Sequence, residues 1–151
     1  AAILMISRGT PFWQAGEEML RTKDGDENSY QSSDEINNID WSVLKEGTLP
    51  HQTMLYYKGL IEMRKAYTVF YNAAEISHVA LGDGAVAVTF LGQNGEVALA
   101  VINPHNAPLS YELNGEWNLV ADGDRAGAEV LAQETGSIQV AGRTIRVYIG
   151  Q

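Results

Sequence analysis

Residues 76–104 read ISHVALGDGAVAVTFLGQNGEVALAVINP, and this stretch decides the fold class. Apolar and β-branched side chains alternate with small or polar ones in three short segments, Ile76–Leu81, Ala85–Leu91 and Glu96–Ile102. Two glycine-containing triplets separate these segments, Gly82-Asp83-Gly84 and Gln93-Asn94-Gly95. A period of two residues, interrupted by glycine-containing turns, is the pattern of antiparallel strands joined by hairpins.

The same pattern continues to the end of the chain. Five further segments have it: Leu109–Leu113, Trp117–Ala121, Glu129–Leu131, Ser137–Val140 and Thr144–Ile149. Asn94-Gly95 and Asn114-Gly115 are the strongest hairpin turns. About eight short strands at a spacing of roughly ten residues predict an all-β sandwich over residues 73–151.

The residues before position 73 have a different organisation. An apolar run at Thr10–Gly16 is typical of a buried strand, and a polar stretch follows from Glu17 to Asp40. Apolar side chains then recur at helical spacing, which predicts a helix over residues 51–66 with Thr48 available as its cap. We therefore expect two domains, residues 1–72 and residues 73–151.

Composition excludes several classes of protein. The chain has 151 residues, 45% of them hydrophobic, no cysteine and a net charge of −9. That charge has the wrong sign for nucleic-acid binding, and no apolar run reaches the ~18–20 residues of a membrane span. The first six residues, AAILMI, read as the end of a hydrophobic helix entered part-way and not as a signal peptide. A secreted and a cytoplasmic location both stay open.

Few residues carry a recognisable chemical motif. Asp24–Glu35 has oxygens at the positions of a calcium-binding loop, but Ser29 stands where glycine makes the sharp turn. Cation binding by this loop stays open, and no metal ligand or organic cofactor is assigned. Neighbouring Glu17 and Glu18 point to opposite faces of a strand, so they do not form a catalytic carboxylate pair. The three tryptophans are either core residues or platforms for sugar rings.

The first zone resembles a known family. The motifs are GTPFWQAGEE at residues 9–18, LRTK at 20–23, GDENSY at 25–30 and INNIDW at 36–41. In this order they resemble type I pullulanases, which are starch and glycogen debranching enzymes of the α-amylase superfamily of glycoside hydrolases. The resemblance covers the whole first zone, and the remainder resembles the C-terminal region of the family.

The resemblance implies a fold that is mainly β with α. Residues 1–72 are then the last strand, rim loop and last helix of a (β/α)₈ barrel, with Phe12–Glu18 as the strand and Met19–Trp41 as the loop. The β-sandwich follows. The active sites of such barrels lie at this rim.

The resemblance also implies site residues. Arg21, Asp26, Asn28 and Tyr30 are the positions expected near bound glucose units. The family's catalytic Asp, Glu and Asp match nothing in this sequence, so no catalytic residue is assigned and the chain alone is expected to be inactive. Whether the chain is by itself an enzyme is therefore undecided.

Three functions remain open. The chain is a C-terminal fragment of a hydrolase that cleaves α-1,6-glucosidic branch linkages in pullulan, starch or glycogen, or a carbohydrate-binding module, or a purely structural β domain. The expected partners are an α-glucan and the missing N-terminal barrel segment, without nucleic acid or membrane. Self-association through the exposed strand segment is a further expectation, because a barrel strand without neighbours leaves its backbone edges unpaired.

Overall fold

The computed structural model describes all 151 residues and divides into two compact units. The sheet unit consists of Ala1–Pro11 and Lys58–Gln151, and the loop unit consists of Phe12–Tyr57. The boundary expected between residues 72 and 73 stays a prediction. We describe each unit by itself.

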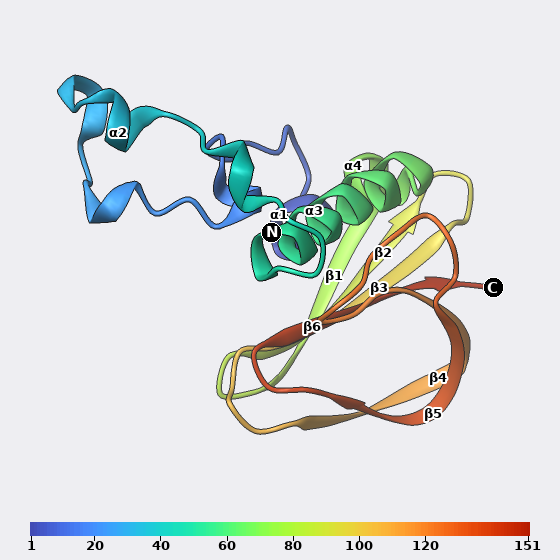
Figure 1. The fold of residues 1–151 in the computed structure, drawn as a ribbon. Coiled ribbons are helices and arrows are strands. Elements are labelled where there is room, and N and C mark those ends of the chain that lie inside the picture. Colours follow the sequence, from blue (N-terminus) through green and yellow to red (C-terminus); the bar gives the residue numbers. More distant parts are fainter. The chain divides into compact units, whose positions relative to one another are not determined.

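The sheet unit contains one antiparallel sheet of six strands in the order β1-β2-β3-β6-β4-β5 (Figure 1). The strands are β1 Ala73–Gly82, β2 Ala85–Gly92, β3 Val97–Asn103, β4 Leu109–Ala121, β5 Ala132–Val140 and β6 Thr144–Gly150. The protein is thus mainly β with a few helices, as the sequence predicts.

Turn chemistry sets the register of the first three strands. Asp83 and Gly84, between β1 and β2, have φ values of 47° and 87°. Two successive residues with positive φ are what a tight two-residue hairpin requires. Between β2 and β3 the backbone N–H of Gly92 donates to the carbonyl of Glu96, which closes the turn around Asn94-Gly95. Both hairpin predictions in this region are therefore confirmed.

The prediction of eight strands is wrong, because the structure has six. Leu109–Leu113 and Trp117–Ala121 are the two halves of the single strand β4. Asn114-Gly115 does not form a hairpin but lies where the pairing of β4 with β5 shifts register. Such an irregularity bends a strand without reversing it. Residues 129–131 form no strand, although the N–H of Leu131 donates to the carbonyl of Leu119.

The core lies between the two ends of this sheet, as in a sandwich. Its buried members come from β2, β3, β4, β5 and β6: Ala87, Leu99, Val101, Leu113, Leu119, Ile138, Val140 and Tyr148. The half of β4 before the register shift pairs with β5 alone, whereas the half after it pairs with both β5 and β6. The bend in β4 thereby brings side chains of β4 and β5 against those of β2 and β3.

Two polar side chains of this unit are buried, and each forms hydrogen bonds within the protein. The Asn103 side chain is 1% exposed and donates to the carbonyls of Ala107, Val140 and Ala141. The Tyr148 hydroxyl donates to Glu134 at 2.8 Å, and Arg146 pairs with the same carboxylate at 2.7 Å. Burial, followed by the bond to Glu134, raises the pKa of Tyr148 well above its usual range.

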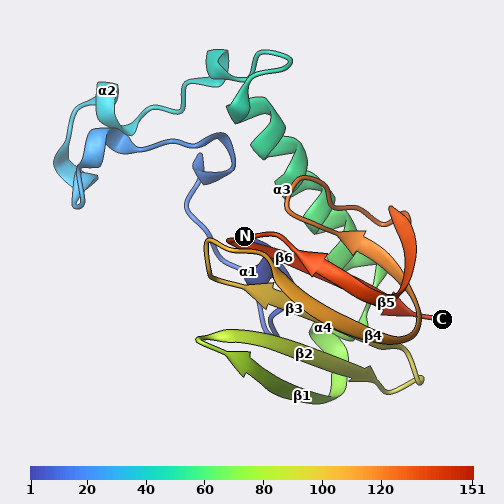
Figure 2. The same ribbon diagram turned by 90° about the horizontal axis from the view of Figure 1, so that it is seen from below.

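Short helices accompany the sheet. These are α1 Ala2–Ile6 and α4 Val69–Asn72, and α4 contacts β2 and β3 (Figure 2). Phe70 of α4 meets Phe90 of β2 edge to face at 5.7 Å between ring centroids. The predicted helix is confirmed as α3, Leu49–Ala66, with Leu60 and Met63 fully buried. Since its first nine residues belong to the loop unit, α3 continues from one unit into the other.

The N-terminal segment of the sheet unit is held by arginine. Arg64 of α3 donates to the carbonyls of Met5 at 2.6 Å, Ser7 at 2.9 Å and Gly9 at 2.6 Å. The first two carbonyls lie at the C-terminal end of α1, where a positive charge is favourable. No helix of the protein is long and apolar enough to cross a membrane.

The loop unit lacks the strand expected at Phe12–Glu18. Residues 12–14 have no regular structure, and Glu17–Met19 form a 3₁₀ turn. The physical reason is that a parallel strand obtains its backbone hydrogen bonds from neighbouring strands, and no other strand of this chain pairs there. The barrel part of the fold prediction is accordingly not confirmed.

Candidate functional site in the loop unit

The loop begins at a tight turn around Gly16. Gly16 has φ 94°, and its carbonyl accepts from the N–H of Arg21 at 3.0 Å. The Glu18 carboxylate accepts from the N–H of Gly16 at 3.0 Å, and Glu17 accepts from the Tyr57 hydroxyl at 3.1 Å. The two glutamates therefore anchor the turn in different directions and do not form a catalytic pair.

Tyr57, in the middle of α3, connects this helix to the turn. Its ring is buried and meets Trp13 edge-on at 6.0 Å between centroids. Burial first, and then the hydrogen bond to Glu17, raises the pKa of Tyr57 to about 12. The hydroxyl therefore stays protonated at neutral pH and remains a donor to the carboxylate.

The backbone after this turn is strained. Leu20, Lys23 and Asp24 have φ values of 63°, 50° and 52°, which residues other than glycine rarely adopt. Each such residue costs on the order of 1–3 kcal/mol, and it persists only where surrounding contacts hold it. Strain of this kind is concentrated at ligand-binding and catalytic sites.

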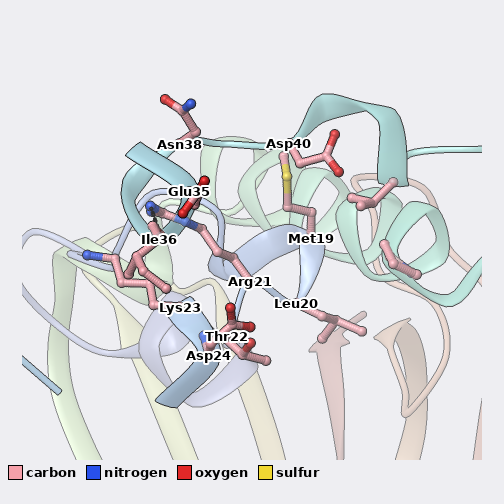
Figure 3. Close-up of a pocket in the computed structure, with 12 residues that line it drawn as sticks. Met19, Leu20, Arg21, Thr22, Lys23, Asp24, Glu35, Ile36, Asn38 and Asp40 are labelled. Atoms are coloured by element: carbon pink, nitrogen blue, oxygen red, sulfur yellow. Dashed lines mark hydrogen bonds between the residues drawn. The ribbon is translucent and has the colours of Figure 1, made fainter. Parts of the chain in front are cut away.

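Arg21 supplies part of the holding contacts. Its guanidinium donates to the carbonyls of Ala15 and Ile36, each at 3.2 Å, and to that of Asn37. Figure 3 shows the Arg21 side chain extending from the loop towards the segment that contains Ile36. The guanidinium therefore links the two ends of the loop across fifteen or more positions of sequence.

A second set of contacts meets at Asn37, at the end of the short helix α2, Asp34–Asn37. The Asn37 amide nitrogen donates to the carbonyls of Ser29 at 2.7 Å and Ser32 at 3.0 Å. Its side-chain oxygen accepts from the Lys23 ammonium at 3.4 Å, and the same ammonium donates to the Ser29 hydroxyl at 2.6 Å. Asn37 thus joins the turn at residue 23 to the turn at residues 29–32.

Three of the four predicted site residues lie together at the tip of the loop. The Asp26 carboxylate accepts from the N–H of Asn28 at 3.0 Å and from the Ser32 hydroxyl. These bonds, led by the one from Ser32, lower the pKa of Asp26 below its usual value. Asn28 is exposed, and Tyr30 is 78% exposed. Arg21, in contrast, lies at the base of the loop and faces its backbone.

A pocket of about 330 Å³ opens beside the base of the loop (Figure 3). Of the four predicted site residues only Arg21 lines it. The lining residues are Met19, Leu20, Arg21, Thr22, Lys23, Asp24, Glu35, Ile36, Asn38, Asp40, Val43 and Pro50. The pocket therefore carries charged groups of both signs around the strained backbone.

No group of three or more His, Asp or Glu side chains in the structure converges as metal ligands do. The tryptophans differ in environment: Trp41 is 64% exposed, while Trp13 and Trp117 are partly buried. Trp41 is thus the one tryptophan that offers an open face for a sugar ring.

Sequence reasoning did not assign Lys23, Ser29 or Asn37 to the site. All three stand inside the motifs that carry the family resemblance, so membership of a motif was the available signal. Their role is visible only in the folded chain, because the bonds join residues six to fourteen positions apart in a segment without regular periodicity.

Known proteins resemble this chain in sequence. The pullulanase of Bacillus subtilis is 46% identical over 70 residues, which cover 46% of this chain and 9% of that protein. An isoamylase from a Flavobacterium species is 35% identical over 79 residues, 49% of this chain and 10% of the relative. The matches thus span about a tenth of the length of these relatives. No protein-family model matches the chain.

A solved structure resembles the whole chain. The pullulanase from Bacillus acidopullulyticus superposes with a TM-score of 0.87 at 26% sequence identity, over 99% of this chain and 19% of that protein. The match includes both the sheet and the loop, since nearly all residues are covered. In sequence and in fold, this chain is similar to C-terminal portions of pullulanase-type debranching enzymes.

Proposed function

We propose that the chain is a C-terminal portion of a glycoside hydrolase that cleaves α-1,6-glucosidic branch linkages in pullulan, starch or glycogen. The observation that carries this proposal is the 46% identity to the Bacillus subtilis pullulanase. The similarity of fold to a second pullulanase supports it. In this proposal the chain supplies the loop unit to the edge of a glucan-binding cleft and adds the β domain.

We expect the chain alone to be inactive. Glycoside hydrolysis needs two carboxyl groups on opposite sides of the scissile bond, about 5–10 Å apart, one of them protonated. Three carboxylates of the loop already accept hydrogen bonds from the protein: Glu17 from Tyr57, Glu18 from Gly16 and Asp26 from Ser32. A lowered pKa also keeps Asp26 ionised, which does not suit a general acid.

The tip of the loop suits contact with glucose units. An ionised carboxylate and an exposed amide are hydrogen-bonding partners for sugar hydroxyls, and an exposed tyrosine ring stacks on a sugar face. Asp26, Asn28 and Tyr30 provide these groups on one short segment. Arg21 belongs to the same site in this proposal, as the residue that fixes the base of the loop.

The test supplies the part of the enzyme that the chain lacks. Bacillus subtilis pullulanase is truncated so that it lacks the region matched by this chain, and the truncated enzyme is mixed or fused with the chain. We expect no release of reducing sugar from pullulan by either part alone and measurable release by the combination. Hydrolysis by the chain alone would refute its inactivity, and an inactive fusion that is folded would refute the proposed origin.

For residues 73–151 a structural role is favoured over carbohydrate binding. Tyr148 is fully buried, and Tyr111 and Trp117 are partly buried against the core, so none of these aromatic rings forms an open platform. We therefore expect the β domain by itself not to be retarded in an amylopectin affinity gel. Retardation that free maltose abolishes would instead identify it as a carbohydrate-binding module.

We further propose that residues 12–18 associate with the missing barrel segment or with a second copy of the chain. Phe12 is 87% exposed in the structure, which is costly for a large apolar side chain. Sedimentation equilibrium tests the second option, with the Phe12→Ser variant as comparison. A monomer mass for both proteins at all concentrations would exclude self-association.

A further inference from the structure

We propose that Asn37 is the positioning residue of the glucan-contacting loop, which it holds in shape without touching the sugar. This inference rests on the proposed function of the loop. Its starting point is that the three exposed or anionic groups at the tip, Asp26, Asn28 and Tyr30, lie on backbone that has no regular hydrogen-bonded structure beyond one short 3₁₀ turn. Their relative positions must therefore be maintained by side chains.

The Asn37 side chain is the centre of these contacts. Its amide nitrogen satisfies the carbonyls of Ser29 and Ser32, the first residue of the turn and the residue just after it. Tyr30 stands between those two carbonyls in the chain. Ser32 in turn donates its hydroxyl to Asp26, so the position of the Asp26 carboxylate depends on the same residue. The side-chain amide of Asn37 thus determines the positions of both Tyr30 and the Asp26 carboxylate.

The other face of Asn37 stabilises the strained turn. Its side-chain oxygen accepts from Lys23, which has φ 50°, and its backbone carbonyl accepts from Arg21. The Lys23 ammonium also reaches the buried Ser29 hydroxyl at 2.6 Å. Aspartate, which has the same size and shape, would lack at position 37 the two N–H donors that this arrangement requires.

The decisive variant is Asn37→Asp. It keeps the size of the side chain and the oxygen that faces Lys23, but it removes both donors to the carbonyls. The matched control is Gln31→Glu, which makes the same change from amide to carboxylate at an exposed position of the same turn. A second comparison is Asp26→Ala, which removes a proposed sugar contact and leaves Asn37 in place.

Three quantities are measured on the complete 151-residue chain. Urea unfolding followed by far-UV circular dichroism reports the stability of the sheet, and we expect no change in it for Asn37→Asp. Amide hydrogen exchange of Ser32 reports the turn, because its N–H donates to the carbonyl of Ser29. Maltotriose binding is followed by NMR shift changes of the Tyr30 amide.

We expect Asn37→Asp to accelerate exchange at Ser32 by about 25-fold, a factor of roughly five for each of two lost hydrogen bonds. Maltotriose affinity should fall by a similar factor, whereas Gln31→Glu should change neither quantity more than about twofold. Asp26→Ala should reduce affinity and leave the exchange of Ser32 within about fivefold of its original rate.

The outcomes separate the two proposals. If the unmodified chain shows no shift with maltotriose, binding by this loop is refuted, while the exchange data still decide whether Asn37 holds the turn. If Asn37→Asp exchanges as slowly as the unmodified chain, the positioning role is refuted. Faster exchange of Ser32 with undiminished maltotriose affinity also overturns the proposal, because Asn37 then stabilises the turn without affecting sugar binding.

Discussion

Replacing Gly59 by alanine has two opposing effects: it raises the helix propensity of α3, and it places a methyl group against the backbone of Ala126. A methyl carbon at position 59 would lie 2.7 Å from the carbonyl carbon of Ala126, and closer still to its oxygen. The oxygen, at 2.0 Å, is the nearer obstacle. Since ordinary van der Waals contact begins at about 3.5 Å, the backbone around Ala126 must retreat by roughly 1.5 Å. Gly59 thus permits the close approach of α3 to the segment that follows β4.

The expected change in the free energy of unfolding is the sum of a steric cost and a gain in helix propensity. Inserting a methyl group into packed structure costs about 1–3 kcal/mol, and the upper end applies here because the obstacle is backbone and not a flexible side chain. Alanine in place of glycine within a helix contributes about 1 kcal/mol in the opposite direction. We expect a net loss of about 2 kcal/mol in the free energy of unfolding, or a Tm lower by about 4–8 °C.

Urea and thermal unfolding followed by far-UV circular dichroism measure this effect. The neighbouring variant Lys58→Ala is the control, because Lys58 is exposed and its ion pair with Glu62 is 3.9 Å long. It should change stability by no more than about 0.5 kcal/mol. A Gly59→Ala protein that is more stable by about 1 kcal/mol would refute the close approach, since helix propensity alone would then account for the result.

Two other predictions concern buried hydroxyl groups. Burial first, and then the bond to Glu17, raises the pKa of Tyr57 from 10.0 to about 12, so its protonated form stabilises the fold below pH 10 and that contribution is lost between about pH 10 and 12. Tyr57→Phe should abolish this part of the pH dependence, measured as unfolding free energy against pH, and an unchanged profile would exclude the titration of Tyr57 as its cause. Glu134→Ala leaves Arg146 and the Tyr148 hydroxyl without their shared partner and should lower the free energy of unfolding by about 2 kcal/mol. Tyr148→Phe removes only one hydrogen bond and should lower it by about 1 kcal/mol. Equal losses for the two variants in urea unfolding would contradict the role of Glu134 as the shared partner.

Local pattern was sufficient where the determining interactions are close in sequence. Helix α3 follows from apolar side chains three and four positions apart, and the confirmed hairpins follow from turns such as Asp83-Gly84, whose backbone conformation is set by the two residues themselves. Asn114-Gly115 shows the limit of such signals. Its residue types are those of a hairpin, yet the chain continues in the same strand, because pairing with β5 and β6 keeps both halves of β4 in one direction.

The candidate site shows the same division. Sequence by itself determined the mainly β character of the chain, the helix, the polar loop and the resemblance to pullulanases, because each depends on periodicity or on residues adjacent along the chain. Only the tertiary structure decided that Arg21 faces the carbonyls of Ile36 and Asn37, and that Asn37 links Lys23 to Ser29. Hydrogen bonds between distant positions depend on where the backbone carries each side chain, and no local pattern in an irregular loop specifies that.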